Sequence, residues 1–246
     1  MTQELSEVND YESLRQWLNE HCKARHTCWH DYGPADYAVY LADPVKILLI
    51  GAESYDYGGC ESIPPNEYLR WIEKGDKTPR YSSVFVAVIR EYIEFLLKRN
   101  QIPQFDRSRW CGYYRNHNLL KDRMCGTIYM NARVTSNDTG SSREDRESIM
   151  SDVREFAAYR KRFIDILRPR ILICAGVSAK CSLFTDGGAF PVSAWRQEDA
   201  VFVLENYVLV NTPHLSRPTA FRGYENLHKI AVQGAKMYVG KYCSDI

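Results

Sequence analysis

Long hydrophobic runs and an excess of one charge are both missing from this sequence. Nowhere do the 246 residues offer about 18 uninterrupted apolar residues, and the polar N-terminus lacks the apolar core of a signal peptide. The 32 basic and 31 acidic residues give a net charge of +1, so no global attraction to nucleic acid or to anionic membranes is expected. We therefore expect a cytoplasmic protein with no membrane partner, in which any polyanion site is a local patch.

Closely spaced cysteine pairs are also missing. The eight cysteines contain no Cys-x-x-Cys motif, which is unlike a zinc ribbon or a redox site. Cys174 lies inside an apolar run and is expected to be a small core residue. Five soft metal ligands do fall within ten residues, namely His21, Cys22, His26, Cys28 and His30. Because structural metal sites combine two closely spaced pairs and no second pair is obvious, we favour a reduced, solvated loop over a metal site here.

Short apolar runs and helical periodicities alternate along the chain. Strands are predicted at residues 45–50, 126–130 and 171–174, and a hairpin or irregular strand pair at 201–205 and 207–210. Helices are predicted at 9–22, 67–73, 84–98, 148–167, 178–184 and 224–238. The first would be capped by Asn9 or Asp10 and the third by Ser82 or Ser83, and residues 100–121 read as a surface connection with local positive charge.

This alternation predicts an α/β fold of one domain. We expect a three-layer α/β/α sandwich with a central, mainly parallel four-stranded sheet. The domain would span residues 1–246, with residues 1–44 as an N-terminal helical extension packed on a core of about 45–240.

The exits of the predicted strands carry polar residues. The four exit segments are 51–56 (GAESYD), 131–133, 175–178 and 211–218. Because the carboxyl ends of parallel strands lie at one edge of a sheet, Glu53, Asn131 and His214 are expected to meet there. Such a set suits cleavage of a base from a sugar. The leaving base needs hydrogen-bond donors, and the oxocarbenium-like sugar needs a carboxylate and a water.

The same four segments resemble those of the uracil-DNA glycosylase superfamily. GAESYD is similar to the family's water-activating motif Gly-Gln-Asp-Pro-Tyr-His, which implies Glu53 as a catalytic residue and Ala52 and Tyr55 at the base. TIYMN is similar to the strand whose last residue pairs with the uracil edge, which implies Asn131 in that role. HLSRPTAFRG resembles the family's His-Pro-Ser-Pro-Leu-Ser loop, which implies His214 as the residue that stabilises the leaving group.

The resemblance also implies a DNA-binding surface and a reaction. Its expected DNA-contacting residues are Ser82, Ser83, Ser178, Ser216, Arg217, Pro218 and Arg222. The implied protein has a uracil-DNA glycosylase-like fold and acts on DNA as a monomer, without metal or other cofactor. It would be a hydrolase, a monofunctional DNA glycosylase that releases uracil or a related modified base after base flipping.

Some residues depart from the family pattern and leave alternatives open. Glu53 is one methylene longer than the family's aspartate, Ser54 replaces a proline, and Pro218 is a shorter wedge than leucine. Tyr68, Trp71 and Tyr81 are the candidates for the aromatic that stacks on the base, and packing in the core or in a lid is an equal alternative for each. One alternative is a catalytically weak or inactive nucleic-acid or modified-base binder on the same fold. The other, a small-molecule or nucleotide enzyme on a generic doubly wound fold, lacks the phosphate-cradling glycine pattern.

Overall fold

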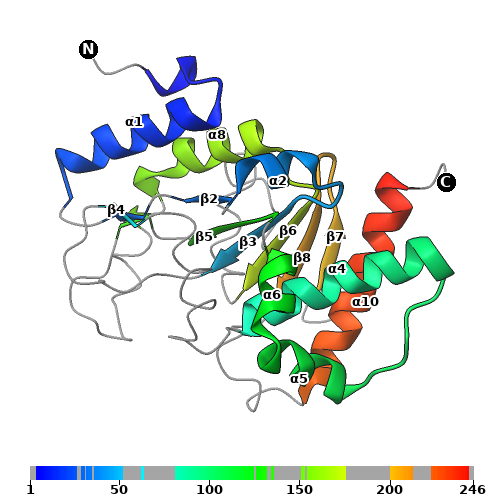
Figure 1. Cartoon of the computed structure of the whole chain (residues 1–246). Coiled ribbons are helices and arrows are strands. Elements are labelled where there is room, and N and C mark those ends of the chain that lie inside the picture. The colour runs from blue at the N-terminus through cyan, green and yellow to red at the C-terminus, as the bar shows by residue number, and fades with distance from the viewer. Residues whose placement is uncertain are drawn as a thin grey trace.

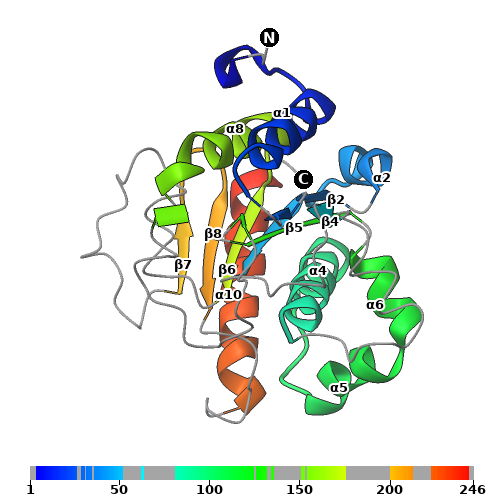
Figure 2. The same ribbon diagram turned by 90° about the vertical axis from the view of Figure 1, so that its left-hand side faces the viewer.

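A computed structural model of the chain shows a layered α/β architecture. It describes residues 4–26, 29–30, 32–34, 36–51, 62–63, 81–124, 126–131, 134–135, 151–152, 154–175, 200–212 and 223–243. Within these residues, one mainly parallel sheet has helices on both faces (Figures 1 and 2). Among the same residues, no helix is both long enough and apolar enough to cross a bilayer.

The centre of the sheet consists of four parallel strands, as the apolar runs predict. In spatial order they are β5 (Thr127–Asn131), β3 (Ile47–Gly51), β6 (Ile171–Ala175) and β8 (Val208–Thr212). These runs are apolar throughout because both of their faces are covered by helices. The predicted total of four strands is wrong, since the sheet formed by the described residues has six.

The two additional strands lie at the edges and run antiparallel to their neighbours. β2 (Gly33–Pro34) pairs with β5, and β7 (Val201–Val203) pairs with β8 as the first arm of the expected hairpin. β2 is only two residues long and contains a proline, which is tolerated at a sheet edge but gives no apolar run to detect. The N-terminal segment thus contributes an edge strand to the sheet as well as helices.

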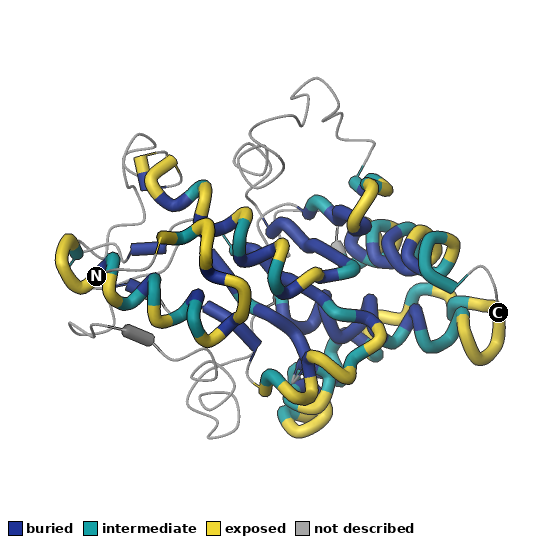
Figure 3. The backbone as a smooth tube through the Cα atoms, turned by 90° about the horizontal axis from the view of Figure 1, so that it is seen from above, coloured by how far each residue is buried: buried dark blue, intermediate teal, exposed yellow. Residues whose placement is uncertain are grey.

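Successive residues of the central strands point to opposite faces and build two separate cores. Leu48 and Ile50 contact the layer of α1 (Tyr11–Lys23), α2 (Tyr37–Ala42) and α8 (Ala157–Leu167). Ile47 and Leu49 contact the opposite layer, made of α4 (Tyr81–Arg99), α5 (Arg107–Arg115), α6 (His117–Met124) and α10 (Gly223–Tyr242). Figure 3 shows the buried strands between these layers.

Helix α1 begins where its capping residue predicts. The side chain of Asp10 accepts a hydrogen bond from the backbone N–H of Ser13 at 2.9 Å, which satisfies one free donor of the first turn. Leu14 and Leu18 are fully buried in the same core as α8. Around this layer lie the short helix η1 (Leu5–Glu7) and a separate parallel pair, β1 (Trp29–His30) with β4 (Ser62–Ile63).

Several predicted boundaries need correction. Helix α4 begins at Tyr81, so Ser82 and Ser83 belong to its first turn and neither is its cap. Leu97, expected in the buried stripe, is 47% exposed near the end of α4. Residues 100–121 are not an irregular connection, because they contain α5 and most of α6. The predicted helices at 67–73 and 178–184 lie outside the described residues.

Candidate functional site

The candidate site is the edge of the sheet at which the four parallel strands end. In the strand register, Gly51 lies opposite Asn131, and Ala175 lies opposite Thr212. The register between β3 and β6 pairs Ile50 with Cys174, so all four strand ends are level with one another. This confirms that the four polar exit segments leave the sheet at one edge.

Most predicted site residues follow this edge in sequence but lie outside the described residues. They are Ala52, Glu53 and Tyr55 after β3, Ser178 after β6, and His214, Ser216, Arg217, Pro218 and Arg222 after β8. Glu53 and His214 are each two residues beyond a described strand end in the sequence.

Asn131 is the predicted base-reading residue that the structure describes. It is the last residue of β5 and only 1% exposed, so it belongs to the sheet and is not a turn residue. Its carboxamide lies over Gly51 of the neighbouring strand, because a Cβ atom added to Gly51 would lie 2.5 Å from Asn131 Oδ1. Glycine at position 51 therefore provides the space that this side chain occupies.

Tyr129 completes the polar contact at this edge and was missed in the sequence. Its hydroxyl donates a hydrogen bond to Asn131 Oδ1 at 2.7 Å, and it would lie 2.9 Å from a Cβ atom on Gly51. Residues two apart in a strand share a face, so the TIYMN sequence carried the signal that Tyr129 and Asn131 are neighbours. Asn131 is thus held by its own strand on one side and closely covered by β3 on the other.

The two serines at the start of α4 differ in accessibility. Ser83 is 1% exposed, whereas Ser82 is half-buried and keeps accessible surface. Of this pair, Ser82 is therefore the one that keeps contact with solvent. Tyr81, a candidate for stacking on a base, opens the same helix, but its side chain is outside the described set, and so are Tyr68 and Trp71.

Helix α5 brings exposed positive charge next to the first turns of α4 and α10. Its buried Trp110 contacts Phe85 of α4 and Tyr224 of α10, with ring centroids 6.3 and 5.6 Å apart. On the outer side, the exposed guanidinium of Arg107 lies over the Tyr224 ring, 5.5 Å from its centroid. This arginine therefore lies beside the first turn of α10, the helix that follows β8 in the described part of the chain. The local positive charge expected between 100 and 121 is therefore on α5.

The predicted solvated loop with five soft ligands is instead largely built into the helical layer. Cys22 belongs to α1 and is fully buried, and burial raises the pKa of its thiol to about 12. His21 Nε2 and His26 Nε2 lie 3.8 and 3.2 Å from the same Glu155 oxygen. Burial, followed by the nearby charge of Arg25, lowers the pKa of His21. Cys28 and the His30 side chain are not described.

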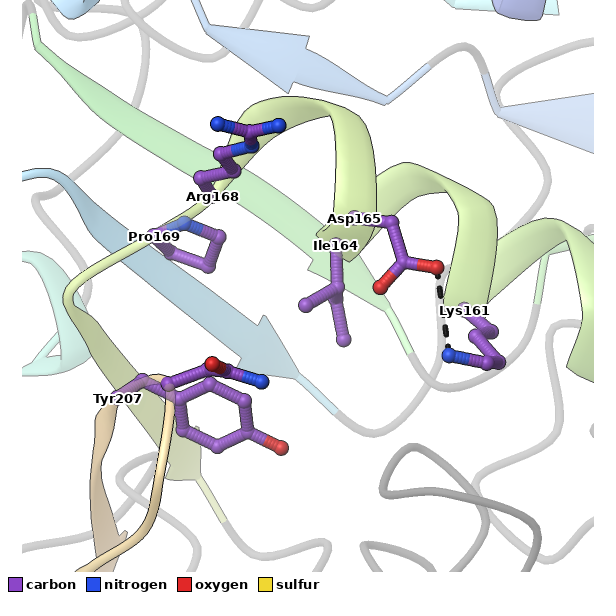
Figure 4. Close-up of a pocket in the computed structure, with 7 residues that line it drawn as sticks. Lys161, Ile164, Asp165, Arg168, Pro169 and Tyr207 are labelled. Carbon is purple, nitrogen blue, oxygen red and sulfur yellow. Dashed lines mark hydrogen bonds and ion pairs between the residues drawn. The ribbon is translucent and has the colours of Figure 1, made fainter. Parts of the chain in front are cut away.

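The described parts of the chain contain a pocket but no cluster of metal ligands. No group of three or more His, Cys, Asp or Glu side chains there is arranged to hold a metal ion. A pocket of about 480 Å³ is present, lined by Lys161, Ile164, Asp165, Arg168, Pro169, Asn206 and Tyr207 (Figure 4). Pro169 precedes β6 and Tyr207 precedes β8, so this pocket lies at the opposite, amino-terminal edge of the sheet.

The chemistry of this pocket differs from that of the candidate site. Lys161 and Asp165 form an ion pair at 3.3 Å across successive turns of α8, and the Tyr207 ring lies across the cavity from them (Figure 4). The pocket contains none of the residues predicted for base recognition or catalysis.

Comparison of the sequence with protein-family models and with curated proteins returned no match. The features of this chain that bear on its function are the four exit segments in the sequence and the geometry of the strands that precede them.

Proposed function

We propose that the protein is a DNA N-glycosylase that hydrolyses the N-glycosidic bond of uracil, or of a related modified base, flipped out of DNA. The observation that supports this most is the common edge of β5, β3, β6 and β8. There, Asn131 ends β5, and the segments that carry Glu53 and His214 follow β3 and β8 in the sequence. An acid, an amide and an imidazole at one sheet edge are the groups that this reaction needs.

Each side chain has a separate role in the proposed reaction. Asn131 pairs with the edge of the flipped base, and Tyr55 excludes bulk at its 5-position. His214 donates a hydrogen bond to the base as it leaves with the bonding electrons, which stabilises the departing anion. Glu53 orients the water that attacks C1′ and offsets the positive charge of the sugar. The products are the free base and an abasic site.

DNA binding in this proposal depends on local contacts because the net charge is only +1. Ser82 and the serine segments after β6 and β8 would contact phosphates, together with Arg217 and Arg222. The exposed Arg107 on α5 adds positive charge beside the start of α10. Phosphate contacts of this kind make affinity fall steeply with added salt.

An excision assay on duplex and single-stranded uracil DNA tests the proposal. We expect Glu53→Gln and His214→Ala to lower the single-turnover rate by about a hundredfold or more, since each removes a group that stabilises transition-state charge. Glu205→Gln is the matched control, because Glu205 is an exposed carboxylate in the turn between β7 and β8, at the amino-terminal edge of β8. Equal residual activity in wild type, Glu53→Gln and His214→Ala would assign the activity to a contaminant.

A second candidate function keeps the binding and loses the hydrolysis. The observation that favours it is the pair of departures at Glu53 and Ser54, which alter the carboxylate reach and the backbone next to it. A binding protein of this kind would show salt-dependent affinity for DNA carrying the modified base, with no abasic product after long incubation.

A further inference from the structure

We propose that the pocket at the amino-terminal edge of the sheet binds an anionic small molecule with a flat aromatic body, of the size of a nucleoside monophosphate. In this site Arg168 binds the anionic group of the ligand. The pocket lies at the end of the sheet opposite the candidate site, because its residues precede β6 and β8. The inference therefore goes beyond the proposed function and does not depend on it.

The size and the apolar lining of the pocket suit an aromatic ring. Its volume of about 480 Å³ lies within the range of about 300–1,000 Å³ that is usual for small-molecule sites. Ile164 and Tyr207 are 9% and 8% exposed, and Pro169 is buried beside them. Figure 4 shows the Ile164 side chain pointing from α8 into the space beside the Tyr207 ring. A flat ring can pack against these apolar groups and lose its contact with water.

Three charged residues of the lining follow one another along the end of α8. Lys161, Asp165 and Arg168 are spaced four and three residues apart, so they lie on one face of the helix. Lys161 forms its ion pair with Asp165 at 3.3 Å. For the exposed Arg168 guanidinium, the described part of the chain supplies no carboxylate at ion-pair distance. Arg168 is therefore the cation of the pocket whose charge the described residues leave unbalanced.

The backbone of Arg168 is unusual for the end of a helix. Its φ of 49° and ψ of 57° are left-handed, a conformation that helix ends normally give to glycine or asparagine. Asn100 ends α4 with the same geometry: its φ is 51° and its N–H donates to the Leu96 carbonyl at 2.9 Å, as that of Arg168 donates to Ile164 at 2.8 Å. Arginine thus occupies a strained position at the one of these two helix ends that borders the pocket, and such strain is typical of functional sites.

The charges at the pocket favour an anion. Two cations and one carboxylate line it, which gives a net charge of +1. The carbonyl end of α8 opposes this with about half a negative charge. The full charge of Arg168 outweighs that half charge, and its guanidinium offers two parallel N–H donors to a phosphate or carboxylate. Asp165 has acceptor oxygens for a hydroxyl of the ligand, such as one on a ribose.

Titration calorimetry with adenosine monophosphate, benzoate and inorganic phosphate tests the proposal. We expect saturable binding of at least one of the two aromatic anions, and the tighter of the two identifies the class of ligand. In Arg168→Gly the affinity should fall by about tenfold or more, because a charge-assisted contact is lost. The same variant should raise the Tm by about 1–4 °C, because glycine adopts the left-handed conformation without strain.

Two further variants assign the loss of affinity to the guanidinium. Asn100→Gly is the matched control, because it places glycine in the same conformation at the end of α4 and should keep the wild-type affinity. Arg168→Gln retains a long polar side chain without the charge, and we expect it to bind as weakly as Arg168→Gly.

Three results would overturn the inference. The first is the absence of saturable binding of either aromatic anion at millimolar concentration, and the second is equal affinity in wild type and both Arg168 variants. The third is inorganic phosphate binding as tightly as adenosine monophosphate, which would show a bare anion site without the aromatic part. Uracil excision is measured separately on the same proteins, so each of these results leaves the proposed function standing.

Discussion

Gly51→Ala is the sharpest test of the packing at the candidate site. Position 51 ends β3 directly opposite Asn131, and its added Cβ atom would lie 2.5 Å from Asn131 Oδ1 and 2.9 Å from the Tyr129 hydroxyl. Carbon–oxygen contacts become ordinary at about 3.4 Å. The carboxamide must therefore move by nearly 1 Å, and the tyrosine hydroxyl by about half as much.

The size of the effect follows from this displacement. Extra atoms in a packed interior cost about 1–3 kcal/mol, and for a chain of this length each kcal/mol lowers the Tm by about 2–4 °C. If Asn131 reads the base, a displacement of about 1 Å also lowers the excision rate by about a hundredfold. We expect both losses in Gly51→Ala, measured by thermal unfolding and by single-turnover excision of uracil.

Gly112→Ala is the matched control, because it is the same chemical change in a different environment. A Cβ atom on Gly112 in α5 would meet nothing within 4 Å. Since alanine is the better helix former by about 1 kcal/mol, this variant should be as stable as wild type or slightly more stable. A Gly51→Ala protein with the Tm and activity of Gly112→Ala would show that Asn131 does not occupy the space over Gly51.

Two further predictions concern buried charge and buried thiols. Asp43 and Arg90 form an ion pair in which each side chain is only 10% exposed. Asp43→Ala leaves the buried Arg90 guanidinium without its carboxylate, so we expect it to cost about 3–5 kcal/mol of unfolding free energy in urea titrations. Glu12→Ala, which breaks the exposed pair with Arg15, should cost less than about 1 kcal/mol, and equal losses would contradict this reasoning. Site-resolved alkylation at pH 8 should label Cys22 about a thousandfold more slowly than an ordinary thiol, because burial raises its pKa from 9.0 to about 12. The half-buried Cys111 and Cys243 serve as internal references. The pKa of the Cys22 thiol is higher in the folded state than in the unfolded state. The contribution of this thiol to stability is therefore complete below pH 9 and is lost between pH 9 and about 12. Unfolding measured as a function of alkaline pH, in wild type and in Cys22→Ala, checks this loss of stability. In the alkylation experiment, a Cys22 thiol that is labelled as fast as that of Cys111 would refute the burial of Cys22.

The central strands were predictable because a strand that is buried on both faces has a continuous run of apolar residues. The apolar runs at 45–50 and 171–174 correspond to β3 and β6 within one residue at the carboxyl end, and Cys174 is buried as expected. β2 was not predictable, since two residues carry no periodicity. Its place is set by pairing with β5, which is a tertiary contact.

Helices α5 and α6 were not predicted from the sequence for a different reason. The apolar positions of α5 are aromatic residues, Trp110 and Tyr113, placed among arginines and asparagines that are typical of a surface loop. Their helical spacing of three is visible only if tyrosine and tryptophan are counted as core residues. The cap was readable, since Asp106 accepts from the backbone N–H of Ser108 at 2.8 Å.

At the candidate site, the sequence predicted which residue ends β5 but not what that residue contacts. Asn131 was predicted from its place at the end of an apolar run, and the structure confirms that place. Gly51 was read as the start of a loop, whereas it is the strand residue whose missing side chain accommodates Asn131. That role depends on the register between two strands far apart in the chain, and two strands that are apolar throughout do not specify which residue lies opposite which.

The two candidate functions predict different effects for variants of the base-binding residue and of Glu53. In both proposed functions Asn131 contacts the bound base before any bond breaks, so a binding protein and a glycosylase should depend on it alike. In the proposed hydrolysis Glu53 acts on water and on the sugar charge, which develops only in the transition state. A glycosylase should therefore lose rate but keep affinity in Glu53→Gln, while a binding protein should be indifferent to that change. If Asn131→Ala weakens binding to uracil DNA while Glu53→Gln alters nothing, the fold recognises a base without cleaving it. If both variants have effects, one on binding and the other on rate, the edge is a glycosylase active site.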